Sequence, residues 1–197
     1  IRGAGNLLGD EQSVHVAAVG FELYCLMIDE AVAEAGEASG EGEEAPEPVR
    51  LDVPVDAYLP ASFVPFEAAK IDIHRRIVAA REPGQLRAIR DELADRFGEL
   101  PPQAENLLKL QKARIELGLA GARSVEFRGG RLSVTGVELD SEQAGVLAEQ
   151  VEGALYEWRE QTAALRVAGD PEERLAAVLA LAAGLREAQR PAEAAAA

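Results

Sequence analysis

The sequence of 197 residues contains few of the residues on which many functional sites depend. It has a single cysteine, Cys25, which excludes an internal disulfide and fits a reducing, cytoplasmic setting. Aromatic residues make up only 5% of the chain, so aliphatic side chains and alanine must build the core. No apolar run approaches the roughly 18 residues of a transmembrane helix, and no segment has the pattern of a signal peptide.

Common catalytic and metal-binding motifs are also absent. There is no G-x-x-x-x-G-K-[ST] loop, so the chain cannot hold a nucleotide in that manner. His15, His74 and Cys25 lack the spacing of zinc ligands, and Cys25 is expected to be buried and inert. We expect His74 to lie on a solvated helix face beside Arg75 and Arg76. The chain is therefore not expected to be an enzyme by itself.

Negative charge is concentrated near the beginning of the sequence. The net charge is −15, and the first 49 residues hold eleven acidic residues and one basic residue, a charge of −10. Residues 36–48 mix glutamate with glycine and proline and have almost no apolar side chain to bury, which predicts a flexible acidic linker. An acidic binding tail is the alternative, and the composition favours the linker. The overall charge argues against a chain that binds nucleic acid over its whole surface.

The segment before the linker predicts one amphipathic helix over residues 19–35. Its apolar side chains recur at steps of three and four residues, at Phe21, Tyr24, Cys25, Ile28 and Val32. The sequence begins at Ile1 and its only methionine is Met27, so we expect its natural beginning to be missing.

After the linker the pattern predicts one strand and three helices. Alternating apolar residues over 49–55 predict a strand, and Pro54 places it at an edge or a strand end. Helical spacing of apolar residues then predicts helices over residues 66–80, 86–97 and 102–119. Pro102 suits the first turn of the third helix, and Gly118 and Gly121 are expected to close it.

Beyond Gly121 the apolar period changes from helical to alternating. Gly129 and Gly130 separate two alternating runs, which predicts a β-hairpin. Asp140 and Gln143 have the spacing of a capping box. The helix that they open is expected to carry Leu147, Val151 and Leu155.

The last part of the chain predicts one more strand and one more helix. Residues 162–167 have the composition of a short strand. Asp170 followed by Pro171 is a strong helix start, and the helix is expected to run through Leu185, before a frayed tail over residues 191–197. The elements do not alternate as βαβ units, so residues 49–190 are predicted to form a compact α+β domain of about five helices with a small sheet and hairpin.

Two charged groups are candidates for contact sites. Glu92, Asp95 and Arg96 share one helical face. Spacing alone favours an ordinary Glu92–Arg96 pair, worth about 0.2–0.5 kcal/mol, over a docking patch. The most basic part of the domain consists of Lys70, Arg75, Arg76, Arg81, Arg87 and Arg90. Nearby acids dilute it and no aromatic side chains are interleaved for stacking, so it is a weak candidate for nucleic-acid binding.

Four sequence blocks resemble the C-terminal end of bacterial transcription-repair coupling factors. They are IRGAGNLLGDEQS at 1–13, VGFELY at 19–24, FEAAKIDIHRRI at 66–77 and DELADRFGELP at 91–101. The resemblance keeps this order over about residues 1–136. The first block is shared with RecG-type translocases, and its combination with the DELADRFG helix makes the match specific.

The resemblance implies that residues 1–35 are the end of a translocation module. In that family the first block belongs to the motif called "translocation in RecG", which couples ATP hydrolysis to stepping along double-stranded DNA. The family's critical arginine and glutamine match Arg2 and Gln12, whereas Val14 stands where the family commonly has glycine. The family's ATP and Mg²⁺ site lies in lobes that the present sequence lacks, so no cofactor is expected in this chain.

For residues 49–190 the resemblance implies a regulatory domain. In that family the domain clamps against the domain that recruits the repair protein UvrA, and masks it until the enzyme engages stalled RNA polymerase. The family's charged clamp residues match Glu92, Asp95 and Arg96, which favours the docking patch on the ground of the resemblance alone. The implied partners of the parent protein are RNA polymerase, double-stranded DNA and UvrA, and no membrane. The alternative is a DNA-binding accessory tail of a RecG-like helicase.

Overall fold

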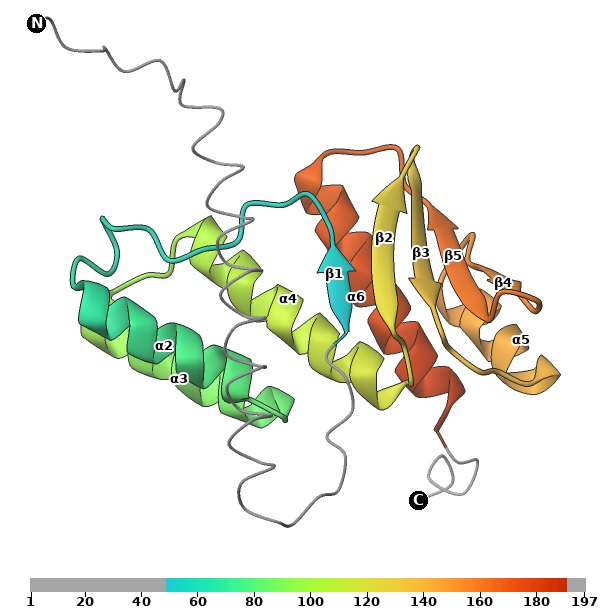
Figure 1. The fold of residues 1–197 in the computed structure, drawn as a ribbon, viewed down its shortest axis with the longest axis horizontal. Coiled ribbons are helices and arrows are strands. Elements are labelled where there is room, and N and C mark those ends of the chain that lie inside the picture. Colours follow the sequence, from blue (N-terminus) through green and yellow to red (C-terminus); the bar gives the residue numbers. More distant parts are fainter. Residues whose placement is uncertain (1–48, 191–197) are drawn as a thin grey trace, which may run out of the picture.

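The computed structural model describes residues 49–190, which form five helices and five strands (Figure 1). The helices are α2 (Glu67–Ala79), α3 (Pro83–Phe97), α4 (Pro102–Leu119), α5 (Ser141–Gln150) and α6 (Pro171–Ala188). The strands are β1 (Arg50–Asp52), β2 (Ser124–Arg128), β3 (Arg131–Thr135), β4 (Leu155–Glu157) and β5 (Thr162–Arg166). The predictions for Arg2, Gln12, His15, Cys25 and the segments 1–35, 36–48 and 191–197 lie outside the described residues. The α+β class predicted from the sequence is confirmed.

The five strands form one mixed sheet in the order β1-β2-β3-β5-β4. Strand β1 is parallel to β2, and the other neighbouring pairs are antiparallel. As the proline predicted, β1 is an edge strand, and it ends two residues before Pro54. The predicted hairpin joins β2 to β3, where Gly129 and Gly130 adopt φ values of 58° and 74°. Both values suit a two-residue hairpin loop, which glycine enters without a steric cost.

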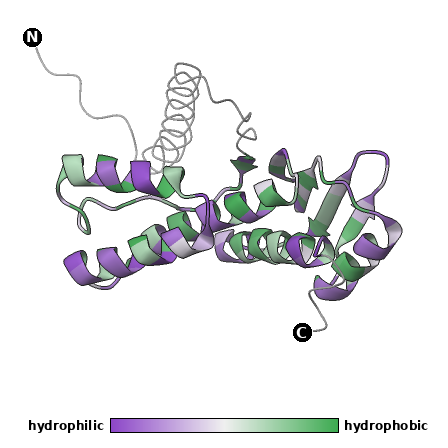
Figure 2. Ribbon diagram, turned by 90° about the horizontal axis from the view of Figure 1, so that it is seen from below, coloured by the Kyte–Doolittle hydropathy of each residue, from purple (hydrophilic) through white to green (hydrophobic). Residues whose placement is uncertain are grey.

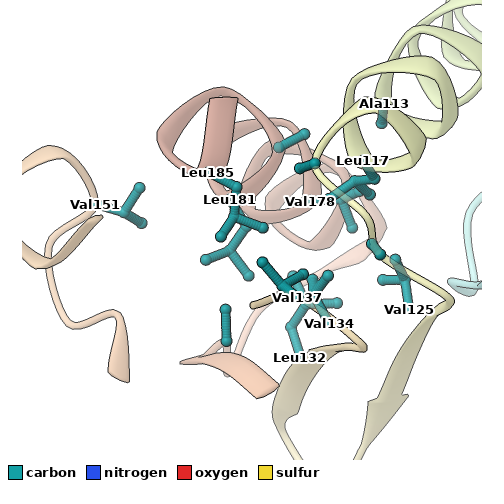
Figure 3. Packing of buried hydrophobic residues seen from close by; sticks show 14 of the residues in the cluster. Ala113, Leu117, Val125, Leu132, Val134, Val137, Val151, Val178, Leu181 and Leu185 are labelled. Carbon is teal, nitrogen blue, oxygen red and sulfur yellow. The ribbon is translucent and has the colours of Figure 1, made fainter. Parts of the chain in front are cut away.

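One face of the sheet is buried against helices. Helices α5 and α6 lie behind the strands in Figure 1, and α4 packs against α6. The buried residues of this sheet lobe include Leu117 on α4, Leu147 on α5, and Val178, Leu181 and Leu185 on α6. Val125, Leu132 and Val134 meet them from the strands (Figure 3), and Ala163 of β5 belongs to the same cluster. These strand residues alternate with mostly polar ones, and no helix of residues 49–190 covers the opposite face of the sheet (Figure 1).

A second cluster of buried side chains forms a helical lobe. Helices α2 and α3 make an antiparallel pair that packs against the first half of α4. The buried residues of this lobe include Val64, Ile73, Ile77, Leu86, Ile89, Leu93 and Leu107. The two lobes lie along the long axis of the molecule and share α4, as two perpendicular views show (Figures 1 and 2). Leu110 of α4 packs against both clusters and so connects them.

The predicted helix starts agree with the structure. The Asp140 side chain accepts hydrogen bonds from the backbone N–H groups of Glu142 and Gln143, and the Gln143 side chain accepts from the Asp140 N–H. The Asp170 side chain accepts hydrogen bonds from the backbone N–H groups of Glu172 and Glu173 at the start of α6, with Pro171 at the first helical position. These contacts satisfy backbone donors that the first helical turn leaves free, which is why short sequence motifs located both helices correctly.

Several element boundaries differ from the predicted ones: β1 is shorter than the strand predicted over 49–55, and α3 begins at Pro83, three residues before the predicted start. The helix opened by Asp140 ends at Gln150, so it does not carry Leu155. Val151 is extended, Gly153 has a φ of 80°, and the chain turns there into β4, where Leu155 pairs with Ala164. The helical spacing of Leu155 was therefore accidental, and pairing with β5 decided its conformation. Gly118 also does not close α4, since it lies inside the helix, where an added Cβ would be 3.6 Å from the side chain of Val49.

Candidate functional site

The charged residues predicted to share one face do so on α3. Leu86, Ile89 and Leu93 occupy the buried face of the helix, which leaves Glu92, Asp95 and Arg96 toward the solvent side. Asp95 is exposed and makes no ion pair among residues 49–190. Its carboxylate is therefore available to a partner without breaking an existing contact.

Glu92 is held by two arginines rather than one. Arg96, one turn further along α3, donates from Nη1 to Oε1 of Glu92 at 2.7 Å, as the spacing predicted. Arg76 on α2 also binds this carboxylate with both of its terminal nitrogens, at 3.0 and 2.5 Å. A bidentate arginine–carboxylate pair is a well-oriented, charge-assisted contact. No sequence signal indicated the second pair, because Arg76 and Glu92 are 16 residues apart and meet only when α2 and α3 pack together.

The two arginines shift the acidity of Glu92. Hydrogen bonds from Arg76 first, and from Arg96 second, lower the pKa of Glu92 from 4.5 to about 2. The reason is that these donors stabilise the ionised carboxylate. Glu92 therefore keeps its negative charge at any physiological pH. One third of its side chain remains exposed, so the charge still faces solvent.

Arg96 is further restrained by an aromatic ring. Its guanidinium group lies 5.0 Å from the ring centroid of Phe97, and Phe97 in turn packs against Phe63 with centroids 5.7 Å apart. A cation above a ring face gains electrostatic stabilisation and loses rotamer freedom. The site thus combines a fixed Glu92–Arg96 pair with the unpaired carboxylate of Asp95. It contains no arrangement of nucleophile and base, and what it offers is a charged surface for binding.

Replacing Arg76 with glutamine is expected to raise the pKa of Glu92 from about 2 toward 4.5. A carboxylate with a lowered pKa stabilises the folded state above pH 4.5, and that stabilisation is lost as the pH falls toward 2. The Arg76→Gln variant should therefore lose part of this pH dependence. NMR titration of the Glu92 carboxyl carbon would measure the shift. Arg75→Gln, at an exposed neighbouring position, is the matched control, and an equal Glu92 pKa in both variants would contradict the assignment.

Half of the basic group noted in the sequence is paired with acidic residues in the structure. Lys70 pairs with Glu67 at 3.0 Å, Arg76 with Glu92, and Arg90 with Glu105 at 2.7 Å. Within the described part of the chain, the members of this group that make no ion pair are Arg75, Arg81 and Arg87. The hairpin of α2 and α3 therefore does not present a continuous basic surface, which weakens the DNA-binding alternative.

His74 does not lie on a solvated face, contrary to the prediction from its neighbours. It is half-buried on α2, and burial, with the charge of Lys70 as a second cause, lowers its pKa from 6.5 to about 4. Arg75 and Arg76 suggested a polar face, but consecutive residues on a helix point in directions about 100° apart. His74 is thus neutral at physiological pH and belongs to the packing of the helical lobe.

An open groove of about 670 Å³ lies between α3, α4 and the beginning of α6. Leu100, Leu175 and Leu179 are among its apolar lining residues. Arg90 and Glu105, also in the lining, already pair with each other. Among residues 49–190 no three His, Cys, Asp or Glu side chains are placed to hold a metal ion. In the same range no helix is both long and apolar enough to cross a membrane.

Comparison with known proteins identifies relatives of both the sequence and the fold. Residues 53–145 match the model of the TRCF domain family. The chain is 40% identical over 135 residues to the transcription-repair-coupling factor of Staphylococcus haemolyticus, an alignment that covers 68% of this chain and 12% of that protein. It is 42% identical over 123 residues to the protein of the same name from Mycobacterium bovis, covering 58% of this chain and 10% of the relative.

A solved structure supports the same relationship at the level of the fold. The crystal structure of the C-terminal domain of a transcription-repair coupling factor aligns with a TM-score of 0.64 and 20% sequence identity. The alignment covers 72% of this chain and 94% of that domain. The chain spans only about a tenth of the length of its full-length relatives. Taken together, the matched sequence and the shared fold show that the chain belongs to the transcription-repair-coupling factor family and corresponds to its C-terminal part.

Proposed function

We propose that this chain is the C-terminal region of an ATP-dependent double-stranded DNA translocase that displaces stalled RNA polymerase and recruits excision repair. In this proposal Arg2 and Gln12 belong to the translocation motif, and ATP and Mg²⁺ bind elsewhere in the parent protein. Residues 49–190 act as an autoinhibitory domain that masks the UvrA-recruiting surface. Membership of the transcription-repair-coupling factor family supports the general role.

The charged face of α3 is the observation that carries the masking role. Glu92 and Arg96 are held in fixed positions by Arg76 and Phe97, while Asp95 is exposed and unpaired among the described residues. We infer that this face binds a complementary charged surface on the UvrA-recruiting domain. Contacts between exposed charges are individually weak and sensitive to salt. Such an interface can hold a mask closed and still open when a stronger partner competes.

Reversing the charge of Asp95 is the most direct test of the mask. The Asp95→Lys variant should bind the isolated UvrA-recruiting domain about tenfold or more weakly, because a like charge would replace an attractive one across the interface. Since Asp95 is exposed and unpaired, the fold should not change. Calorimetric titration of the 197-residue chain at two salt concentrations would give the affinity, with circular dichroism to check folding.

The matched control reverses charge on the sheet lobe, which does not contain α3. Glu149 on α5 and Glu152 just after it are exposed, and their replacement by lysine should leave the affinity unchanged. Equal affinities for the wild type and Asp95→Lys would refute the clamp. Tight, salt-sensitive binding of double-stranded DNA by residues 49–190, with no affinity for the UvrA-recruiting domain, would support the DNA-binding tail instead.

A further inference from the structure

The sheet face that no helix of the described residues covers, called the uncovered face below, carries a row of arginines. Arg128 on β2 is paired in register with Arg131 on β3, and Arg131 with Arg166 on β5. Residues directly opposite in antiparallel strands place their side chains on the same face. Each arginine lies three positions from a core residue of its own strand, namely Val125, Val134 and Ala163, so the row lies on the uncovered face.

This row is electrostatically unfavourable in isolation. Like charges directly opposite each other in neighbouring strands destabilise a sheet. Arg131 is compensated, since it pairs with Glu157 on β4 at 2.5 Å, and this contact raises its pKa. Arg128 and Arg166 are exposed and make no ion pair among residues 49–190. Two uncompensated cations thus flank a compensated one, and their charge is available to an anionic ligand.

The rest of the uncovered face favours a carboxylate-rich peptide over nucleic acid. Short polar side chains lie further along the same face: Ser133 is two positions from Arg131, and at the far end of the strands the Ser124 and Thr135 hydroxyls are hydrogen-bonded to each other at 2.8 Å. No strand residue on this face is aromatic, so bases would find no stacking platform. Asp52 and Glu126 lie on the same face, so an anionic ligand can bind only at the end of the face that holds the arginines. A peptide can place separate carboxylates there, whereas a phosphate backbone carries a negative charge on every nucleotide and would extend past the two acids.

The sequence itself contains a suitable peptide close to this face. Residues 34–47 include six glutamates and no basic residue. This segment ends just before Arg50 at the start of β1, the edge strand next to β2. Arg50 is in register with Ser124, which lies four residues before Arg128 on β2. At ~3.3 Å per residue, the arginine row is therefore about 13 Å from Arg50 along the strand direction. A segment of 14 residues can extend roughly 46 Å, which is ample.

We propose that the acidic segment 34–47 docks on the uncovered sheet face, with its carboxylates paired to Arg128 and Arg166. The contact is intramolecular, so the segment is present at an effective concentration on the order of millimolar, and weak pairs suffice to populate it. The arginine row then acts as a receptor for the chain's own linker. This role is separate from the masking proposed for α3, because it uses the sheet lobe and a different ligand.

Cleavage by a glutamate-specific protease tests the docking in the 197-residue chain. At low salt the segment should be cut about threefold more slowly in the wild type than in the Arg128→Gln/Arg166→Gln variant, as expected for a few exposed ion pairs. Mass spectrometry would follow the fragments cut within residues 34–47. The control is Arg81→Gln/Arg87→Gln, which removes the same charge from two exposed, unpaired arginines of the helical lobe and should cleave like the wild type.

Three results would overturn the proposal. Equal cleavage rates for the wild type and the Arg128→Gln/Arg166→Gln variant would show that the row does not hold the segment. Protection that grows with protein concentration would assign the bound segment to a second copy. Unchanged cleavage together with weaker binding of a double-stranded oligonucleotide by this variant would assign the face to DNA. Thermal unfolding should confirm that the variant stays folded, since removing two like charges relieves repulsion in the sheet.

Discussion

Replacing Leu181 with alanine is expected to lower the free energy of unfolding by about 3–5 kcal/mol, the range observed for fully buried leucines. Leu181 is 0% exposed and lies in the middle of α6, between the sheet and the neighbouring helices (Figure 3). The cluster that surrounds it consists of packed aliphatic side chains, which can fill the space left behind only in part. The loss therefore combines the lost burial with the cost of a cavity.

Urea denaturation followed by circular dichroism would measure the effect of Leu181→Ala. The control is Leu119→Ala at the end of α4, because Leu119 is 59% exposed and its truncation should change stability by less than about 0.5 kcal/mol. A destabilisation of the Leu181 variant no larger than that of the Leu119 variant would mean that α6 is not the central helix of the sheet lobe.

The second large effect concerns the helical lobe. Leu93 is 1% exposed on α3 and packs in the cluster formed with α2 and α4. The Leu93→Ala variant should lose about 3 kcal/mol of stability through the same cavity mechanism. Because Leu93 adjoins Glu92, a loosened α3 should also bring Glu92 and Arg76 together less often. The variant is therefore expected to weaken binding at the α3 face, although it removes no charge.

Hydrogen exchange resolves the effect of Leu93→Ala by lobe. Amides of α2 and α3 should lose more protection than those of β3 and β5, because Leu93 belongs to the cluster of the helical lobe alone. Ile71→Ala is the control, since Ile71 on α2 is 45% exposed. Equal loss of protection in both lobes would show instead that the domain opens as one cooperative unit through α4.

Of the two arginine contacts of Glu92, sequence spacing predicts one and not the other. The pair with Arg96 follows from helical geometry, since residues four apart lie on one face. The pair with Arg76 depends on how two helices pack, and no local rule contains that information. For the same reason no local rule predicts the row formed by Arg128, Arg131 and Arg166. The row depends on the register of β2, β3 and β5, and β5 follows β3 in the sequence only after α5 and β4.

The wrong predictions for Leu155 and His74 have a common physical origin. Leu155 continues a helical pattern of apolar residues. In the structure, however, the chain turns at Gly153, which has a positive φ, and Leu155 pairs with β5. His74 precedes two arginines, but its position on α2 leaves it half-buried. In both cases a contact distant in sequence outweighed a local preference of a fraction of a kilocalorie per mole.

By itself, the sequence determined the features that depend on neighbours along the chain. Helix starts at Asp140 and Asp170, the glycine hairpin and the edge position of the first strand all follow from backbone donors, dihedral limits and the missing N–H of proline. Tertiary structure alone decided which face of the sheet stays open, which arginine supports Glu92, and how two small cores share α4. Burying apolar area stabilises those arrangements, and that area exists only once elements distant in sequence have met.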